Sequence, residues 1–166
     1  MRGTADGWLI ALDIATGEQV WASRIADSDD GRFISMPPLI VDDLVLIGPA
    51  GSEWASKGWV GAFSLQDGKP VWKFNTVPDP GETGSETWGG NPEVLASGGG
   101  DLWTPMSYDV AKGLLYVAVG NLGPTTSTRT VRVPTCIPTA WWRSMCIRAS
   151  WRGTTRRSRT TCWIST

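Results

Sequence analysis

The sequence predicts an all-β protein, and more narrowly a partial β-propeller of about two to three four-stranded blades. A 15-residue pattern near the N-terminus returns in register 51 residues later. Short apolar runs alternate with turns rich in glycine and aspartate. Eleven of the 166 residues are tryptophan, which suggests that the fold uses this large side chain repeatedly. A repeat of about 50 residues made of short strands is typical of propeller blades.

The first copy of the repeat, GWLIALDIATGEQVW, spans Gly7–Trp21. Its apolar run at residues 9–14 predicts a strand, and residues 18–22 predict the returning strand. Thr16-Gly17 between them predicts a tight turn in which the glycine adopts a positive φ. The charged stretch at 26–32 then predicts a loop.

Residues 37–48 predict a hairpin with an acidic tip. The second copy of the repeat, GWVGAFSLQDGKPVW, follows at Gly58–Trp72. The two copies agree at six positions with one constant offset, which is difficult to obtain by chance: Gly7 with Gly58, Trp8 with Trp59, Ala11 with Ala62, Gly17 with Gly68, Val20 with Val71 and Trp21 with Trp72.

A long segment at 76–100, rich in Gly, Pro, Glu and Ser, separates this repeat from the next strands. A connection of this length inside a compact domain is usually functional or disordered. Residues 102–108 and 114–119 then predict one more hairpin, with its turn at 109–113.

The composition excludes several kinds of site. The sequence has no histidine, so a Ser-His-Asp triad and a histidine-ligated metal centre are both excluded. The three cysteines, Cys136, Cys146 and Cys162, match no zinc-ribbon or CxxC spacing. No apolar run reaches the length of a membrane span, and no signal-peptide pattern precedes Gly7.

Charge divides the chain into two parts, residues 1–124 and residues 125–166. The first part carries all sixteen acidic residues and seven basic ones, whereas the second carries eight arginines and no acid. One interpretation is a disordered basic tail that binds nucleic acid. Four tryptophans in the tail argue against ordinary disorder, which is poor in aromatic residues. We favour a tail translated out of phase, which is non-native, disordered and without a nucleic-acid partner.

The out-of-phase interpretation depends on codons. Tryptophan and methionine have one codon each, so a back-translation shifted by one nucleotide is constrained where they occur. In that phase Trp141–Met145 can encode VALDV, and the stretch as far as Arg152 can encode VALDVHTGKLAW, a third copy of the repeat at Ile10–Trp21. Residues 126–130 can likewise encode DFYED, and residues 158–165 can encode PHDVLDLD. Sequencing of the coding DNA tests this prediction.

Three segments together resemble the pyrroloquinoline quinone (PQQ)-dependent alcohol and methanol dehydrogenases: ALDIATGEQVW, IGPAGSEWASKGWVGAFSLQDGKPVW and GGGDLWTPMSYDVAKGLLYVAVGN. The resemblance covers about residues 7–124 and implies a propeller of this type. The pattern A-x-D-x-x-T-G-x-x-x-W at Ala11–Trp21 resembles the family's tryptophan-docking motif, which joins neighbouring blades. The second copy departs from the motif, with Ser64 in place of the aspartate and Asp67 in place of the threonine.

The resemblance also implies a cofactor and metal site. Ala50-Gly51-Ser52-Glu53 matches a turn in which the family's small residues pack on PQQ and its glutamate ligates Ca²⁺. The chemistry fits, because oxygen ligands suit Ca²⁺ and an ion held against the quinone oxygens makes the quinone more electrophilic. Gly51 would let the backbone approach a flat ring closely. The alternative for Glu53 is a surface acid in a polar turn.

Three further residues are implied in the same way. Trp103, which follows three glycines, resembles the tryptophan on which the PQQ ring stacks. Asn121 resembles the family's second Ca²⁺ ligand, and Ser35 lies where the family often has a threonine in contact with the cofactor. The alternatives are one more structural tryptophan for Trp103 and a turn residue beside a glycine for Asn121.

The parent activity that the resemblance implies is oxidation of a primary alcohol or similar hydroxyl substrate by hydride transfer to PQQ. It also implies an electron acceptor such as a cytochrome and a periplasmic location. The family's catalytic aspartate lies in a PHDxxD-type segment, which occurs only in the out-of-phase translation, so we expect no base and no turnover in this chain. The alternative is a non-enzymatic propeller of PQQ-like repeats that serves as a protein-interaction scaffold. Such a scaffold would not carry Glu53, Trp103 and Asn121 together.

Overall fold

The computed structural model describes residues 1–54, 56–82, 85, 98–120, 144–148 and 162–163. The strands in these residues are β1 (Arg2–Gly3), β2 (Trp8–Leu12), β3 (Gln19–Arg24), β4 (Leu39–Val41), β5 (Leu44–Ile47), β6 (Trp59–Ser64), β7 (Pro70–Asn75), β8 (Ser107–Asp109), β9 (Leu114–Ala118), β10 (Ser144–Arg148) and β11 (Cys162–Trp163). Two single-turn 3₁₀ helices, η1 (Ser28–Asp30) and η2 (Ser52–Trp54), lie in the loops. Among the described residues, none of the helices is long and apolar enough to cross a membrane.

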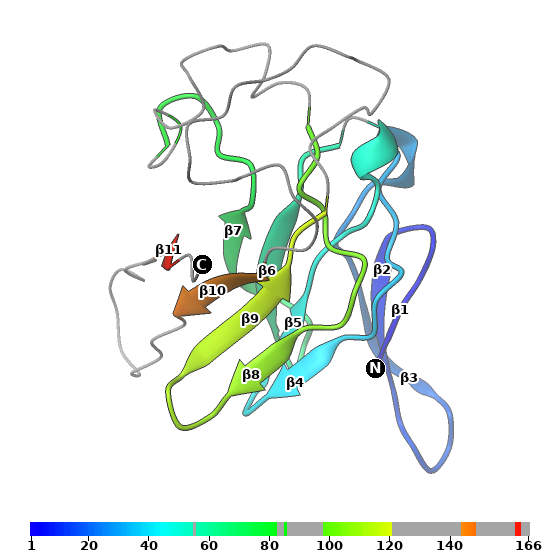
Figure 1. Ribbon diagram of the computed structural model, residues 1–166. Coiled ribbons are helices and arrows are strands. Elements are labelled where there is room, and N and C mark those ends of the chain that lie inside the picture. Colours follow the sequence, from blue (N-terminus) through cyan, green and yellow to red (C-terminus); the bar gives the residue numbers. More distant parts are fainter. Residues whose placement is uncertain (55, 83–84, 86–97, 121–143, 149–161, 164–166) are drawn as a thin grey trace.

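The strands pair antiparallel in three sheets, in the orders β1-β2-β3, β4-β5-β6-β7 and β11-β10-β9-β8 (Figure 1). Two sheets of four strands and one of three agree with two to three propeller blades, so the predicted all-β, partial-propeller fold is confirmed. In Figure 1 both 3₁₀ helices lie at one end of the sheets, and the β4–β5 and β8–β9 hairpin turns lie at the opposite end.

The repeat folds in the same way in both copies. β3 and β7 begin and end at residues 51 apart, and each pairs with its partner strand with a one-residue shift at the equivalent place. The turns also match. The N–H of Gly17 donates to the carbonyl oxygen of Asp13 at 2.9 Å, and the N–H of Gly68 donates to that of Ser64 at 2.9 Å. Both glycines have positive φ, 76° and 70°.

The two turns are closed by different side chains. In the first copy, the carboxylate of Asp13 accepts hydrogen bonds from the backbone of Thr16 and Ala15, which lowers its pKa. In the second copy, the hydroxyl of Ser64 accepts from the N–H of Asp67 at 3.4 Å. Asp67 in turn pairs with Lys69, and its pKa falls to about 2, first because of the hydrogen bond from the Lys69 side chain. The second copy therefore has its acid three positions later than the first copy, and the turn still forms.

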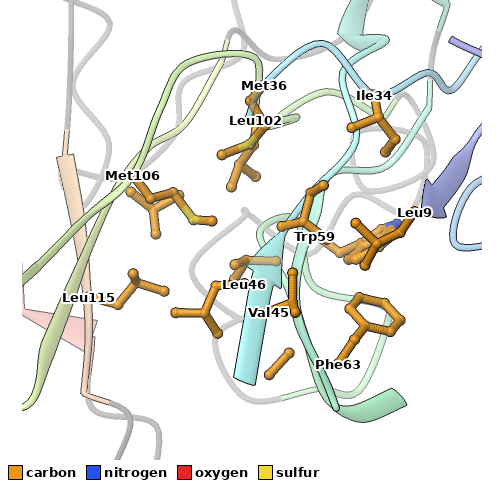
Figure 2. Close-up of a cluster of buried hydrophobic side chains, with 14 of the residues drawn as sticks. Leu9, Ile34, Met36, Val45, Leu46, Trp59, Phe63, Leu102, Met106 and Leu115 are labelled. Atoms are coloured by element: carbon orange, nitrogen blue, oxygen red, sulfur yellow. The ribbon is translucent and has the colours of Figure 1, made fainter. Parts of the chain in front are cut away.

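One hydrophobic core joins all three sheets. β2 contributes Leu9, β5 and β6 contribute half of the remaining residues, and β9 contributes Leu115 and Val117. Figure 2 shows ten labelled members of this cluster: Leu9, Ile34, Met36, Val45, Leu46, Trp59, Phe63, Leu102, Met106 and Leu115. Four of them come from loops, namely Ile34, Met36, Leu102 and Met106. The core therefore fixes the loops that lead to the candidate site as well as the sheets.

Two predicted features differ in the structure. The strand expected at 102–108 forms only as β8, because the N–H of Leu102 donates to the carbonyl oxygen of Pro49 at 2.7 Å and Pro105 has no N–H for a ladder. The start of the segment is therefore hydrogen-bonded to the candidate site instead of to β9. In the tail, where we expect disorder, residues 144–148 and 162–163 are strands, since β9 offers β10 an edge to pair with. The rest of the tail, including the segments that we translated out of phase as DFYED and VALDV, lies largely or wholly outside the described residues.

Candidate functional site

The predicted turn begins three residues after β5 ends. Ala50 pairs with Phe33: the N–H of Ala50 donates at 2.8 Å and the N–H of Phe33 donates at 3.1 Å, each to the other's carbonyl oxygen. Gly51 follows with a φ of 135°, and a Cβ there would lie 2.4 Å from the carbonyl oxygen of Gly31. Only glycine fits this position, and the backbone that it approaches closely is that of Gly31.

The single turn η2 divides buried from exposed side chains. Ser52 is buried, and its hydroxyl oxygen accepts a hydrogen bond from the N–H of Asp101 at 3.1 Å. Glu53 is exposed, so its carboxylate oxygens are accessible to a ligand from solvent. Trp54 is also exposed, and its Cβ packs against Gly31. Ser52 therefore holds the turn to the rest of the chain while Glu53 is presented outward.

Trp103 is held beside this turn by the glycine segment that precedes it. Residues 98–100 all have positive φ, which three consecutive glycines allow. The N–H of Gly99 donates to the carbonyl oxygen of Ser56 at 2.6 Å, and the N–H of Gly58 donates to that of Gly99 at 2.9 Å. Trp103 emerges from this pairing with 53% of its surface exposed.

The residues that follow β9 also lie beside Ser52 and Trp103. The N–H of Gly120 donates to the carbonyl oxygen of Asp101 at 2.8 Å. A Cβ on Gly120 would lie 3.3 Å from the hydroxyl oxygen of Ser52 and 3.6 Å from Cδ1 of Trp103. Three segments far apart in the sequence thus converge at Gly120. Asn121, the predicted second metal ligand, is the next residue and lies outside the described residues.

Asp101 is a residue at this site that our sequence reasoning missed. It is 1% exposed, its Oδ2 accepts a hydrogen bond from the Ser56 hydroxyl at 2.6 Å, and its Oδ1 is buried without a hydrogen-bond partner. Burial raises the pKa of Asp101 to about 6, although hydrogen bonds from Ser56 and Ser52 oppose the rise. Nearby charges act in both directions on this pKa, which Arg32 lowers and Glu53 raises. An acid placed directly after three glycines and before Leu-Trp was the available signal.

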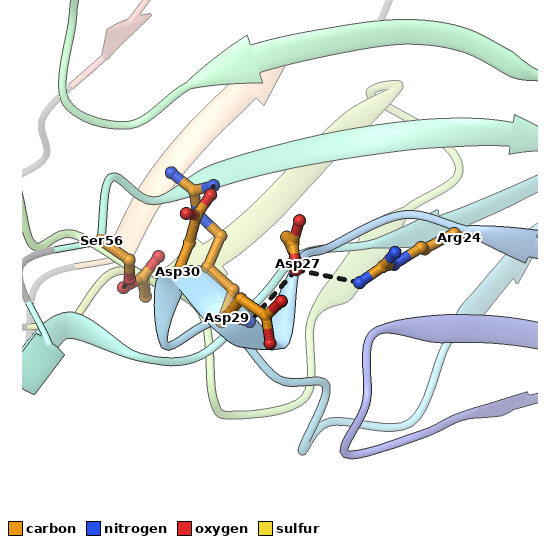
Figure 3. Close-up of polar contacts among 7 residues, drawn as sticks. Arg24, Asp27, Asp29, Asp30 and Ser56 are labelled. Carbon is orange, nitrogen blue, oxygen red and sulfur yellow. Dashed lines mark hydrogen bonds and ion pairs between the residues drawn. The ribbon is translucent and has the colours of Figure 1, made fainter.

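Polar contacts within the loop between β3 and β4 hold the segment that precedes Phe33 (Figure 3). Asp27 caps η1 by accepting from the N–H of Asp29 at 3.1 Å, and it pairs with Arg24 at 2.9 Å. Arg32 pairs with Asp30 at 3.0 Å, while its Nε is buried without a hydrogen-bond partner. Exposed pairs of this kind stabilise a fold only slightly, so their main effect is to fix the course of the loop.

Ser35, another predicted cofactor-binding residue, is not joined to the turn by these contacts. It is exposed and lies two residues after Phe33, which pairs with Ala50. Within the described part of the chain, no hydrogen bond links its side chain to the turn at 50–53. Its contact with a cofactor stays a prediction.

The chemical groups at this site, oxygen ligands and an aromatic ring, are of the types that Ca²⁺ and PQQ require. Among the described residues, no group of three or more His, Cys, Asp or Glu side chains could hold a metal ion. Glu53 supplies an accessible carboxylate, and Asn121 would add an amide oxygen; Ca²⁺ takes about six to eight such oxygen ligands, so a bound molecule would have to supply others. The exposed ring of Trp103 offers a planar ligand a surface on which to stack.

Comparison with solved structures supports the fold of this site. The chain superimposes on a europium-containing methanol dehydrogenase with a TM-score of 0.67 and 35% identity, over 73% of this chain and 24% of that one. It superimposes on the quinohemoprotein alcohol dehydrogenase of Comamonas testosteroni with a TM-score of 0.69 and 29% identity, over 86% of this chain and 23% of that one.

Comparison of sequences identifies the family. The chain is 38% identical over 141 residues to quinohemoprotein alcohol dehydrogenase ADH IIB of Pseudomonas putida, which covers 80% of this chain and 20% of that protein. It is 37% identical over 139 residues to the lanthanide-dependent methanol dehydrogenase of Methylacidiphilum fumariolicum strain SolV, which covers 72% of this chain and 22% of that protein. The chain thus spans about a fifth of the length of these relatives. Because the PQQ model for the beta-propeller domain of glucose, ethanol and alcohol dehydrogenases also matches residues 23–130, the chain belongs to this PQQ dehydrogenase propeller family.

Proposed function

We propose that this chain forms part of the PQQ- and calcium-binding site of a dehydrogenase that oxidises a primary alcohol or a similar hydroxyl substrate. The metal ligands are Glu53 and Asn121. The cofactor-binding residues are Ser35, Ala50, Gly51, Ser52 and Trp103. Family membership supports the cofactor class, whereas the metal, the substrate and the individual residue roles are proposals.

The observation that carries the proposal is the convergence at Gly120. The turn with Glu53, the segment with Trp103 and the residue before Asn121 are brought together by two hydrogen bonds. One joins Ser52 to Asp101, 49 residues apart in the sequence, and the other joins Gly120 to Asp101. A propeller that only serves as a scaffold has no need to place an accessible carboxylate, an exposed aromatic ring and a strand end at one point.

The chain's own residues would have distinct tasks there. PQQ with a bound cation supplies the hydride acceptor. Glu53 binds the cation, since its carboxylate is exposed and charged. Trp103 shields one face of the bound ring from water and fixes its plane. Ser52, buried and hydrogen-bonded to Asp101, keeps the turn from moving away.

The metal need not be the same across the family, since one relative is named as lanthanide-dependent and one solved structure as europium-containing. For this chain we propose Ca²⁺.

We further propose that the parent protein acts in the periplasm and passes electrons to an acceptor such as a cytochrome. Residues 125–166 are proposed to be a translation out of phase, in which the catalytic aspartate is lost.

The polypeptide of 166 residues should therefore not turn over. With PQQ, Ca²⁺ and a dye as electron acceptor, we expect no dehydrogenase activity above a control without protein. Activity with a primary alcohol would contradict the proposed absence of a base. The coding DNA provides the second check: codons that cannot encode VALDV in the shifted phase would exclude the out-of-phase tail.

Cofactor binding is tested separately from turnover. Titration with PQQ in the presence of Ca²⁺, followed by quenching of tryptophan fluorescence, gives its Kd. Trp103→Ala should weaken binding about tenfold, because an aromatic stacking contact contributes about 1.4 kcal/mol. Trp54→Ala is the matched control, since Trp54 is also an exposed tryptophan and is not among the proposed cofactor-binding residues. Equal losses in both variants, or none, would contradict the role of Trp103.

A further inference from the structure

The buried carboxyl of Asp101 has contacts that the proposed function does not use. Its Oδ2 accepts from the hydroxyl of Ser56 at 2.6 Å, and its N–H donates to the hydroxyl oxygen of Ser52 at 3.1 Å. Ser52 and Ser56 flank Glu53 on either side, so one residue is hydrogen-bonded to both ends of the segment that carries the proposed metal ligand.

The backbone of Asp101 makes the connection to the other two segments. Its carbonyl oxygen accepts from the N–H of Gly120 at 2.8 Å, one residue before Asn121. The next residue, Leu102, donates its N–H to Pro49 at 2.7 Å, and Trp103 follows directly. Asp101 therefore contacts the turn and the strand end, and it precedes the proposed stacking residue by two positions.

The burial of this carboxyl is unusual for a purely structural residue. A carboxyl side chain that is 1% exposed and has one oxygen without a hydrogen-bond partner costs folding free energy, whereas an apolar side chain would bring no such unpaired oxygen. Groups retained in such positions are more often found at functional sites than in ordinary cores. Glu53 and Arg32 are the charged side chains whose fields act on it.

We propose that Asp101 is a positioning residue, which locks the Glu53 turn against the Trp103 segment through Ser52 and Ser56. This inference rests on the proposed function for its consequence, since the lock would set the spacing between the metal ligand and the stacking surface. Asp101 acts through its neighbours and is not itself assigned a contact with cofactor or substrate.

The lock is tested first without any ligand, by amide hydrogen exchange on the full chain. Asp101→Ala and Ser56→Ala should each speed exchange about tenfold in both segments, 49–58 and 98–104, because each removes a buried hydrogen bond that joins them. β5 and β6 should keep their protection. Asp101→Asn should restore slow exchange, since its amide oxygen can still accept from Ser56. Asp43→Ala, at the exposed tip of the β4–β5 hairpin, is the matched control.

The consequence for the site is tested with Tb³⁺ as a probe of the metal position, through luminescence sensitised by tryptophan. Asp101→Ala and Ser56→Ala should weaken Tb³⁺ binding about tenfold although Glu53 is intact, and Asp101→Asn should return it to near the wild-type value. If Glu53→Gln loses Tb³⁺ while both alanine variants bind it normally, the proposed metal site stands and the positioning role is overturned. If the wild-type chain binds neither Tb³⁺ nor PQQ, the proposed function fails, and exchange still decides whether the lock exists. Faster exchange confined to residue 101, or spread evenly over the sheets, would overturn the lock.

Discussion

The contact between Trp21 and Gly68 gives a quantitative test of how one repeat packs on the next. The ring of Trp21 lies so close to Gly68 that a Cβ there would be 2.5 Å from Cε3 of Trp21 and 2.5 Å from the hydroxyl oxygen of Ser23. Gly17 occupies the equivalent position in the first copy, with a similar φ, and a Cβ there would have no heavy atom within 4 Å. The two glycines therefore share a backbone conformation that would strain any residue with a Cβ, and they differ in packing.

The magnitudes follow from these two contributions. Gly17→Ala should cost about 1–2 kcal/mol of unfolding free energy, which is the penalty of alanine at positive φ. Gly68→Ala should cost this amount plus about 1–3 kcal/mol for inserting a methyl group into occupied space. Any gain from restricting the unfolded chain is the same in both variants and cancels in the comparison.

Urea unfolding of the full chain, followed by circular dichroism, measures the difference at the transition midpoints. We expect Gly68→Ala to unfold at clearly lower urea than Gly17→Ala. In a Trp21→Ala background, the extra cost of Gly68→Ala should shrink, because the ring that the methyl group meets is gone. Equal midpoints for Gly17→Ala and Gly68→Ala in the wild-type background would refute the docking of Trp21 on the second repeat.

Two further predictions concern single groups. Trp21→Phe should lower the free energy of unfolding by about 1 kcal/mol, because the indole Nε1 of Trp21 donates to the carbonyl oxygen of Leu65 at 3.0 Å. Trp72→Phe should lower it less, since in the described residues the ring nitrogen of Trp72 makes no hydrogen bond. Thermal unfolding compares the two variants. Because the pKa of Asp101 is raised from 3.8 to about 6, the folded chain binds more protons than the unfolded chain between these values, and stability should fall as pH rises through this window. Asp101→Asn should remove this fall in unfolding free energy, which amounts to at most about 3 kcal/mol. Identical pH profiles for the variant and the wild type would contradict the burial of this carboxyl.

The repeats could be predicted from the sequence because their determinants are local. Glycine at a turn, an apolar run before it and a terminal tryptophan recur with one offset, and the structure repeats them down to the one-residue shift in strand pairing. The turn at 50–53 was recognised through its resemblance to the family's turn, and this was possible because its small residues and single acid are contiguous. Where a pattern is contained in about fifteen residues, the chain specifies it directly.

Features that depend on distant partners could not be predicted in this way. Asp101 was missed because its partner Ser56 is 45 residues away, and nothing local shows that the carboxyl is buried. The segment at 102–106 has an apolar pattern that favours a strand, but Leu102 is hydrogen-bonded to Pro49 instead. The strand β10 forms because β9 offers an edge, which is a property of the folded sheet and not of residues 144–148 alone.

The turn at Glu53 is proposed to hold a cation beside the cofactor surface, and the other proposed roles depend on this. Binding of Tb³⁺ to the full chain, measured by tryptophan-sensitised luminescence and by displacement with Ca²⁺, tests it most directly. Glu53→Gln should weaken binding at least about tenfold, because it removes the charged oxygen ligand, while Glu18→Gln, which changes an exposed acid in the first turn, should leave it unchanged. The same Kd for Glu53→Gln and the wild type would contradict the assignment of Glu53 as a metal ligand.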